Sequence, residues 1–187
     1  MKRFAAFLQA SLALAGLAVA VLAAVGCTHT ATKSVDVASD IRTSLDQAGF
    51  KDVSSTQDRD KGVVTLGGHV ADESAKRQAE SIASSHAGGQ VVSNQIAVIP
   101  VGGESDAKAV NSDLDSGIEK NLDAMLIENK LHDAVKYSVK NHVITLTGDV
   151  DSEDKRTQAA SLAASVPNVQ QVVNELQVKQ QKATSTN

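Results

Sequence analysis

The chain has 187 residues, with 18 Lys and Arg against 22 Asp and Glu, and it contains no Trp. The formal net charge of −4 argues against nucleic-acid binding, because such proteins carry a basic face. Aromatic residues are limited to three Phe and one Tyr, so any hydrophobic core must consist mainly of Val, Leu, Ile and Ala.

Residues 1–26 have the three parts of a secretory signal peptide. Lys2 and Arg3 give a positive start, residues 4–25 carry no charge, and Gly26 precedes a cysteine. The run approaches the roughly 20 apolar residues that span a bilayer, so an uncleaved membrane anchor is the alternative. A mature chain that begins at Cys27 would lack Lys2 and Arg3 and keep 16 basic against 22 acidic side chains.

Residues 24–27, Ala-Val-Gly-Cys, resemble the lipobox of bacterial lipoproteins. In that family the cysteine thiol is diacylated, the peptide is cut before the cysteine, and the new amine is acylated with a fatty acid such as palmitate. Cys27 is the only cysteine, so it has no internal disulfide partner in an oxidising compartment. The resemblance implies lipidation at Cys27. Thr28 stands where Asp retains Gram-negative lipoproteins in the inner membrane, which implies an outer-membrane anchor facing the periplasm.

Residues 27–33 are expected to form a lipidated tether, and residues 34–100 predict a first small domain. The expected elements are a helix capped by Ser34 or Asp36 and ended by Gly49, a strand at 53–57, a turn at 60–62, a strand at 63–70, a helix capped by Asp72, and a strand at 92–98. Alternating apolar residues place Val64, Leu66 and Val70 on one face of the sheet.

Residues 101–111 contain Gly102, Gly103 and Ser105 and predict a flexible linker. Residues 112–180 then predict a second domain, followed by a tail at 181–187. The expected elements are a helix capped by Ser112 with Asp115 as a capping-box partner, a strand at 135–139, a turn at 140–142, a strand at 143–150, a helix capped by Ser152, and a strand at 172–178.

The two domains are copies of one sequence. Residues 63–70, VVTLGGHV, match residues 143–150, VITLTGDV, and the same 80-residue offset continues without a gap to Val98 and Val178. One register through a strand, a helix and a second strand indicates a duplication. The predicted fold class is therefore α+β: two tandem α-β-β-α-β domains, each a small three-stranded sheet with two helices on one face.

Three segments of the second copy resemble the BON domain, which is named for bacterial osmotic-stress and nodulation proteins. They are residues 144–150 (Ile-Thr-Leu-Thr-Gly-Asp-Val), 159–163 (Ala-Ala-Ser-Leu-Ala) and 169–178 (Val-Gln-Gln-Val-Val-Asn-Glu-Leu-Gln-Val). The first copy departs from the pattern at Gly88-Gly89, where the second has Asn168-Val169. The resemblance implies a non-catalytic envelope module that binds phospholipid surfaces or supports envelope integrity.

Four residues recur at matching positions and predict structural roles. Gly68 and Gly148 suggest a close backbone approach or a bulge within a strand. Asn94 and Asn174 are expected to hydrogen-bond a local backbone turn, with contact to a ligand as the alternative.

No pattern predicts a metal site, a cofactor or a catalytic centre. His29, His69, His86, His132 and His142 do not repeat between the copies, although a site built into the fold should survive duplication. The acidic run at 149–154 includes a predicted helix N-terminus, where carboxylates are favoured by the helix dipole. We therefore expect no enzyme activity.

One feature of the second copy suggests a lipid contact. On its first helix, Ile127 lies about 180° from the core-facing Ile118 at 100° per residue, and Lys120, Lys130 and Leu131 extend an exposed patch. An exposed Ile beside lysines can insert shallowly while the ammonium groups reach headgroups. An isolated exposed apolar residue is also ordinary, and the helix could end early and turn Ile127 inward.

Two function classes remain. The first is a lipid-anchored envelope protein whose domains bind membrane phospholipid and support the outer membrane. The second is a periplasmic chaperone or assembly factor that binds envelope proteins.

Overall fold

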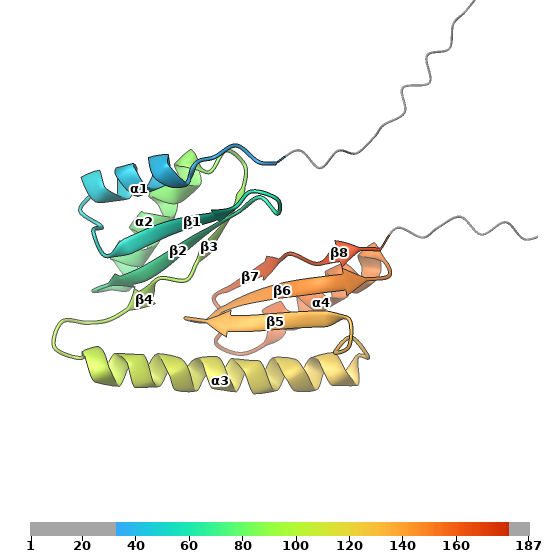
Figure 1. Ribbon diagram of the computed structural model, residues 1–187. Helices are drawn as coiled ribbons and strands as arrows, with labels where there is room; N and C mark the ends of the chain where they lie inside the picture. The colour runs from blue at the N-terminus through green and yellow to red at the C-terminus, as the bar shows by residue number, and fades with distance from the viewer. Residues whose placement is uncertain (1–32, 180–187) are drawn as a thin grey trace, which may run out of the picture. The chain divides into compact units, whose positions relative to one another are not determined.

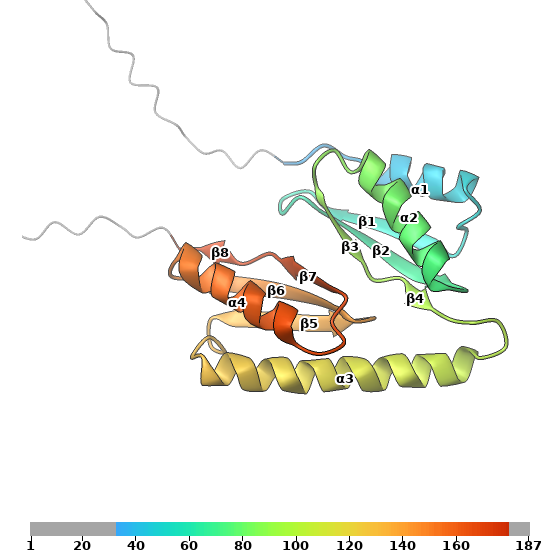
Figure 2. The same cartoon turned by 180° about the vertical axis from the view of Figure 1, so that it is seen from behind.

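The computed structural model describes residues 33–179, which form two copies of one α-β-β-α-β pattern (Figures 1 and 2). Copy one contains α1 (Ala38–Gln47), β1 (Val53–Asp58), β2 (Val63–Val70), α2 (Glu73–His86), β3 (Val91–Asn94) and β4 (Ala97–Val98). Copy two contains α3 (Glu104–Glu128), β5 (Val135–Lys140), β6 (Val143–Val150), α4 (Glu153–Ser165), β7 (Gln171–Asn174) and β8 (Gln177–Val178). The predicted α+β class and the tandem duplication are confirmed.

The long hairpin strand is the centre of each sheet. In copy one, β2 pairs antiparallel with β1, and parallel with β3 and then β4. Copy two has the same topology around β6. A parallel neighbour requires a crossover, which α2 and α4 provide.

Both helices of each copy pack on one face of its sheet. The first core joins Ile41 and Leu45 of α1 with Val64 and Leu66 of β2, and the second joins helix α3 to β6 in the same way. Ala79, Ala83, Ala159 and Ala163 are fully buried on α2 and α4, and these small side chains let helix and sheet approach closely. The aliphatic core expected from composition is confirmed.

The second helix of each copy begins as predicted. Asp72 Oδ1 accepts a hydrogen bond from the Ala75 N–H at 2.9 Å, and Ser152 Oγ accepts one from the Lys155 N–H at 3.3 Å. These contacts satisfy amide groups of the first turn that have no partner within the helix.

The predicted caps of the first helix are wrong in both copies. Helix α1 begins after Val37 with no side-chain cap, because the Val37 N–H donates instead to Gln57 Oε1 at 3.0 Å and holds this segment against the sheet. In copy two, Ser112 lies inside α3, where its carbonyl accepts from Ser116 Oγ. Asp115 accepts hydrogen bonds from the N–H groups of Asn141 and His142 rather than closing a capping box.

Residues 104–111, expected in a flexible linker, form the first turns of α3. Glu104 and Asp106 lie in the first turn, where carboxylates interact favourably with the helix dipole. Nucleating a helix is the costly step, so these residues can extend a helix that the core already stabilises further along the chain. Only Ile99 to Gly103 remain outside regular structure between β4 and α3.

The last strand of each copy, expected to be continuous, is split. Asn94 ends β3, and its Oδ1 accepts from the Ile96 N–H at 3.3 Å; Asn174 Oδ1 accepts from the Leu176 N–H at 3.1 Å. In each copy, this side-chain hydrogen bond takes the place of one backbone hydrogen bond of the sheet. The side chains of Ile96 and Leu176 enter the cores at the break.

The copies contact each other along β3 and β7. The Gln171 side chain accepts from the Asn94 N–H at 2.9 Å and donates to the Val92 carbonyl at 2.7 Å. Lys61 of copy one pairs with Glu175 of copy two at 2.6 Å. The equivalent residues, Asn141 of copy two and Gln95 of copy one, are also in contact, because the Asn141 side chain donates to the Gln95 carbonyl. Val63, Val143 and Val173 form a small buried cluster. The contact therefore involves the outer edge of β3 as well as the valines on the sheet face opposite the helices.

Candidate functional site

The C-terminal end of α3 carries an exposed apolar residue. Ile118, Leu122 and Leu126 are fully buried, whereas Ile127 is 56% exposed. Ile127 follows Ile118 by nine positions, which corresponds to two and a half turns of an α-helix. Ile127 thus lies on the solvent side of a helix whose opposite side is core.

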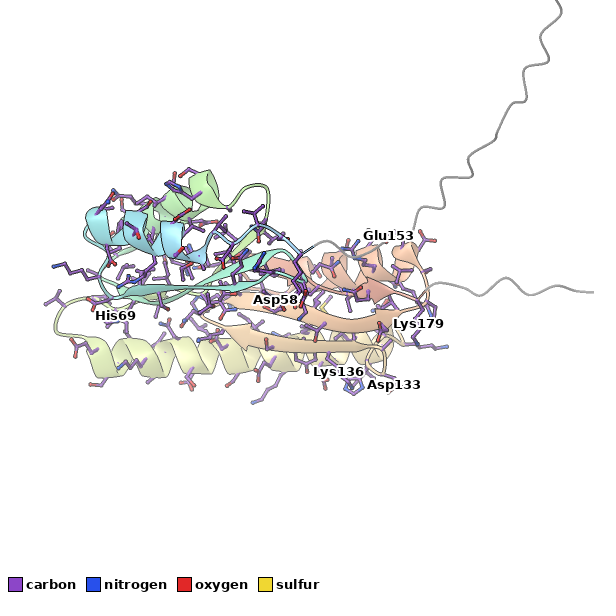
Figure 3. All side chains as sticks on the ribbon, turned by 45° about the horizontal axis from the view of Figure 1, so that its top comes forward. Asp58, His69, Asp133, Lys136, Glu153 and Lys179 are labelled. Carbon is purple, nitrogen blue, oxygen red and sulfur yellow. The ribbon has the colours of Figure 1, made fainter. Side chains whose placement is uncertain are left out.

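Two lysines accompany Ile127. Lys120 and Lys130 are both exposed, and within residues 33–179 neither ammonium group lies within ion-pair distance of a carboxylate. We call Ile127, Lys120 and Lys130 the α3 patch. An acidic side chain is also present here: Asp133 is fully exposed in the segment between α3 and β5 (Figure 3). Attraction to an anionic surface would therefore depend on Lys120 and Lys130 locally and not on the net charge of the region.

Leu131 does not belong to the patch. It is only 2% exposed, because Lys130 adopts a left-handed conformation with φ 58° and turns the chain back toward the core. The Leu131 N–H then donates to the Leu126 carbonyl at 2.8 Å. The helix end seals the core instead of extending the exposed surface.

A hydrogen bond fixes α3 to the sheet near the patch. Tyr137 of β5 donates from its hydroxyl to Asp123 Oδ1 at 3.0 Å, and His132 Nε2 lies 3.1 Å from the same oxygen. Burial and the Asp123 carboxylate raise the pKa of Tyr137 to about 12. The patch is therefore presented by a helix that is tied to the sheet near its C-terminal end.

The recurring glycines lie opposite the carbonyls that precede β1 and β5. Gly68 has φ +95° and Gly148 has φ +120°, a region that L side chains rarely adopt. A Cβ at Gly68 would collide with the Asp52 carbonyl, and one at Gly148 with the Ala134 carbonyl. Both positions combine a strained conformation with a close backbone approach.

The recurring asparagines join a helix to the break in the last strand. Asn94 Nδ2 donates to the Lys76 carbonyl at 3.4 Å and to Glu80 Oε2 at 3.0 Å. Asn174 Nδ2 donates to the Arg156 carbonyl at 3.3 Å. With their oxygens engaged by Ile96 and Leu176, these side chains satisfy backbone groups.

The sequence patterns did not reveal a buried lysine on α2. Lys76 is 6% exposed, and its Nζ donates to Gln170 Oε1 at 2.8 Å across the contact between copies. Burial lowers the pKa of Lys76, while Glu73, Glu80 and Asp115 act in the opposite direction. The sequence carried one signal for this burial. Lys76, Ala79 and Ala83 have helical spacing, which places all three on the same side of the helix.

Other expected features lie partly or wholly outside the described residues. Cys27 and the signal peptide fall outside residues 33–179. In the described part of the chain, no helix is long and apolar enough to cross a membrane. No group of three His, Cys, Asp or Glu side chains within that part could hold a metal ion.

Comparison with known proteins identifies the repeated unit. The family description "BON domain" matches residues 34–100 and residues 114–180. No curated protein matches. Two solved structures of CdsD, a structural protein of the type III secretion system of Chlamydia trachomatis, are similar at 15% identity.

The two CdsD structures differ slightly in coverage. The first, of the C-terminal domain, aligns over 80% of this chain and 100% of that chain with a TM-score of 0.33. The second aligns over 78% and 93% with a TM-score of 0.34. The family matches cover more than half of the chain, in two copies that coincide with the two α-β-β-α-β units. The chain therefore belongs to the BON-domain family and carries two BON domains.

Proposed function

We propose that this chain is a non-catalytic, lipid-anchored envelope protein whose BON domains bind phospholipid membrane surfaces and support outer-membrane integrity. BON domains occur in envelope-associated proteins and are linked to phospholipid binding. The observation that carries the proposal for this chain is Ile127, exposed on a core-packed helix between two lysines that have no ion-pair partner among residues 33–179.

The proposed anchor is Cys27, and it would hold the protein at the membrane. Burial of acyl chains contributes about 0.8 kcal/mol per CH₂, and stable anchoring needs more than one chain. Three chains on Cys27 meet that condition. Cys27→Ser is expected to abolish incorporation of labelled fatty acid in cells and to leave an unprocessed or mislocalised precursor. Labelling equal to that of the unmodified protein would reject the lipoprotein assignment.

The α3 patch supplies a second, weaker contact. Burying one Ile contributes roughly 1.5–3 kcal/mol, and each lysine near an anionic surface adds about 1 kcal/mol. Lys120 and Lys130 would place their ammonium groups among headgroups while their stems lie along the bilayer surface. A contact of this strength suffices once the anchor raises the effective concentration at the membrane.

Flotation with vesicles tests the contact apart from the anchor. A soluble form of residues 28–187 keeps the whole described region, and it should float with vesicles containing phosphatidylglycerol at low salt. Ile127→Glu should reduce flotation, whereas Asn121→Glu, at an exposed position about 120° around the same helix from Ile127, controls for added negative charge. Loss of binding as salt increases would reflect screening of the lysines.

The alternative function is a chaperone or assembly factor for envelope proteins. It would be favoured if the soluble form fails to float even at low salt, or if Ile127→Glu and Asn121→Glu reduce flotation equally.

A further inference from the structure

Copy one carries an apolar hollow where its chain begins. The hollow has a volume of about 650 Å³ and is lined by Val35, Val37, Gly62, Gly88, Gly89 and Val91, with Lys33 and Lys61 at its rim. Val35 is 75% exposed and Val91 is 49% exposed. We call this site the copy-one hollow.

The wall of the hollow is held rigidly. Gln57 Nε2 and Gln90 Nε2 both donate to the Val35 carbonyl, at 2.7 and 3.0 Å. Gln57 also donates to Gln90 Oε1 at 2.6 Å and accepts from the Val37 N–H. The exposed Val35 side chain therefore projects from a residue whose carbonyl already accepts two hydrogen bonds, and burying it would require little further ordering.

Copy two fills the corresponding space. Val139 stands where copy one has Gln57, and Val169 stands where it has Gly89; both pack against the second core. The segment that enters copy two is helical rather than extended. A nearby hollow of about 310 Å³ is lined instead by polar groups that include Asp115 and Glu119. The apolar hollow is thus specific to copy one.

The rim of the hollow is nearly neutral. Lys33 pairs with Asp60 at 3.2 Å, and Lys61 pairs with Glu175 at 2.6 Å and with Asp58 at 3.6 Å. The Glu175 carboxylate raises the pKa of Lys61, so this pair stays charged and mutually satisfied. The surface therefore suits an apolar partner better than an ionic one.

We propose that the copy-one hollow is a second membrane-contact surface, in which Val35 and Val91 enter the boundary between headgroups and acyl chains. Lys33 follows Cys27 by six residues, and an extended segment of that length reaches at most about 20 Å. An anchored Cys27 would hold this end of copy one within that distance of the bilayer. The inference rests on the proposed anchor but uses a different site from the α3 patch.

Single-cysteine labelling of the full lipidated chain tests this surface. Acylation blocks the Cys27 thiol, so Val35→Cys, Val91→Cys and Ile127→Cys can each carry an environment-sensitive fluorophore. Val101→Cys is the matched control, because Val101 is 93% exposed in the connection between copies. Each protein is placed in vesicles of phosphatidylethanolamine and phosphatidylglycerol, with and without lipids that carry a quencher on the acyl chain.

We expect blue-shifted, quenched emission from the labels at 35 and 91, unchanged by added salt, and neither effect at 101. In the soluble form, combined Val35→Glu and Val91→Glu should weaken vesicle binding about tenfold, since two apolar contacts are lost, whereas Val101→Glu should not. Labels at 35 and 91 that behave like the label at 101 would overturn the inference. If the label at 127 is then still quenched, the proposed function stands without it. Quenching at 35 and 91 but not at 127 would support the hollow and reject the α3 patch.

Discussion

The two copies share a core and a topology, yet they differ where the chain enters each domain. Copy one enters through an extended segment tied by Gln57 and Gln90, and its α1 has 10 residues. Copy two enters through α3, a helix of 25 residues, and places Val139 and Val169 where copy one has Gln57 and Gly89. The two copies therefore keep the residues that the fold requires and diverge where the chain enters each domain.

The recurring glycines give the strongest test of what the copies share. Gly148→Val should destabilise copy two, and Gly68→Val copy one, by about 3 kcal/mol or more, because each adds both a clash and a strained conformation. The measurement is chemical unfolding of each variant. Gly117 of α3, where an added Cβ meets nothing within 4 Å, provides the control, since Gly117→Ala should stabilise by roughly 0.5–1 kcal/mol. A tolerated valine at either position would show that the close approach is not required.

The contact between copies is the next test, because it determines whether they unfold independently. Gln171→Ala removes both hydrogen bonds to the backbone of β3 and should cost about 1–3 kcal/mol. Hydrogen exchange at the Asn94 amide should accelerate, while amides within β1 change little. Gln177→Ala, at an exposed position of β8, is the matched control. Unchanged exchange at Asn94 would mean that the copies are not coupled through Gln171.

Tyr137 provides a pH-dependent difference between the copies, since copy one has Ser55 at that position. The folded pKa of Tyr137 is about 12, against 10.0 for a free tyrosine, so the folded chain retains a proton that the unfolded chain has lost. The resulting stabilisation is complete below pH 10 and is lost as the pH rises toward 12. Tyr137→Phe should lower stability by about 1 kcal/mol at pH 8 and reduce the alkaline loss. An alkaline profile identical to that of the unmodified protein would reject this assignment.

The features that recur in both copies were predicted well from the sequence, because each pattern could be checked against the matching positions of the other copy. The strands, the caps Asp72 and Ser152, and the buried alanines follow from alternation, capping chemistry and helical spacing. The segments through which the chain enters each copy were harder to predict. Gly102 and Gly103 suggested flexibility that does not extend to residues 104–111, since the core stabilises all of α3.

Single long-range contacts were not predictable from local patterns. Leu131 was assigned to the surface because helical periodicity does not reveal the left-handed turn at Lys130. The copy-one hollow depends on Gln57, Gln90 and Gly89, which are far apart in sequence and have no matching set in copy two. The departure at Gly88-Gly89 was visible in the sequence, but its consequence for the surface was not.

The central claim is that copy two contacts phospholipid through the α3 patch, and backbone-amide NMR of residues 28–187 with anionic vesicles tests it most directly. Signals from residues 118–131 should broaden or shift at low salt, and Ile127→Glu should suppress the effect while leaving the spectrum of the free protein intact. Signals from residues 41–47 of α1, which do not line the copy-one hollow, should stay unchanged, because no exposed apolar patch is proposed on that helix. Equal changes in α1 and α3, or none at all in the presence of vesicles, would contradict the claim.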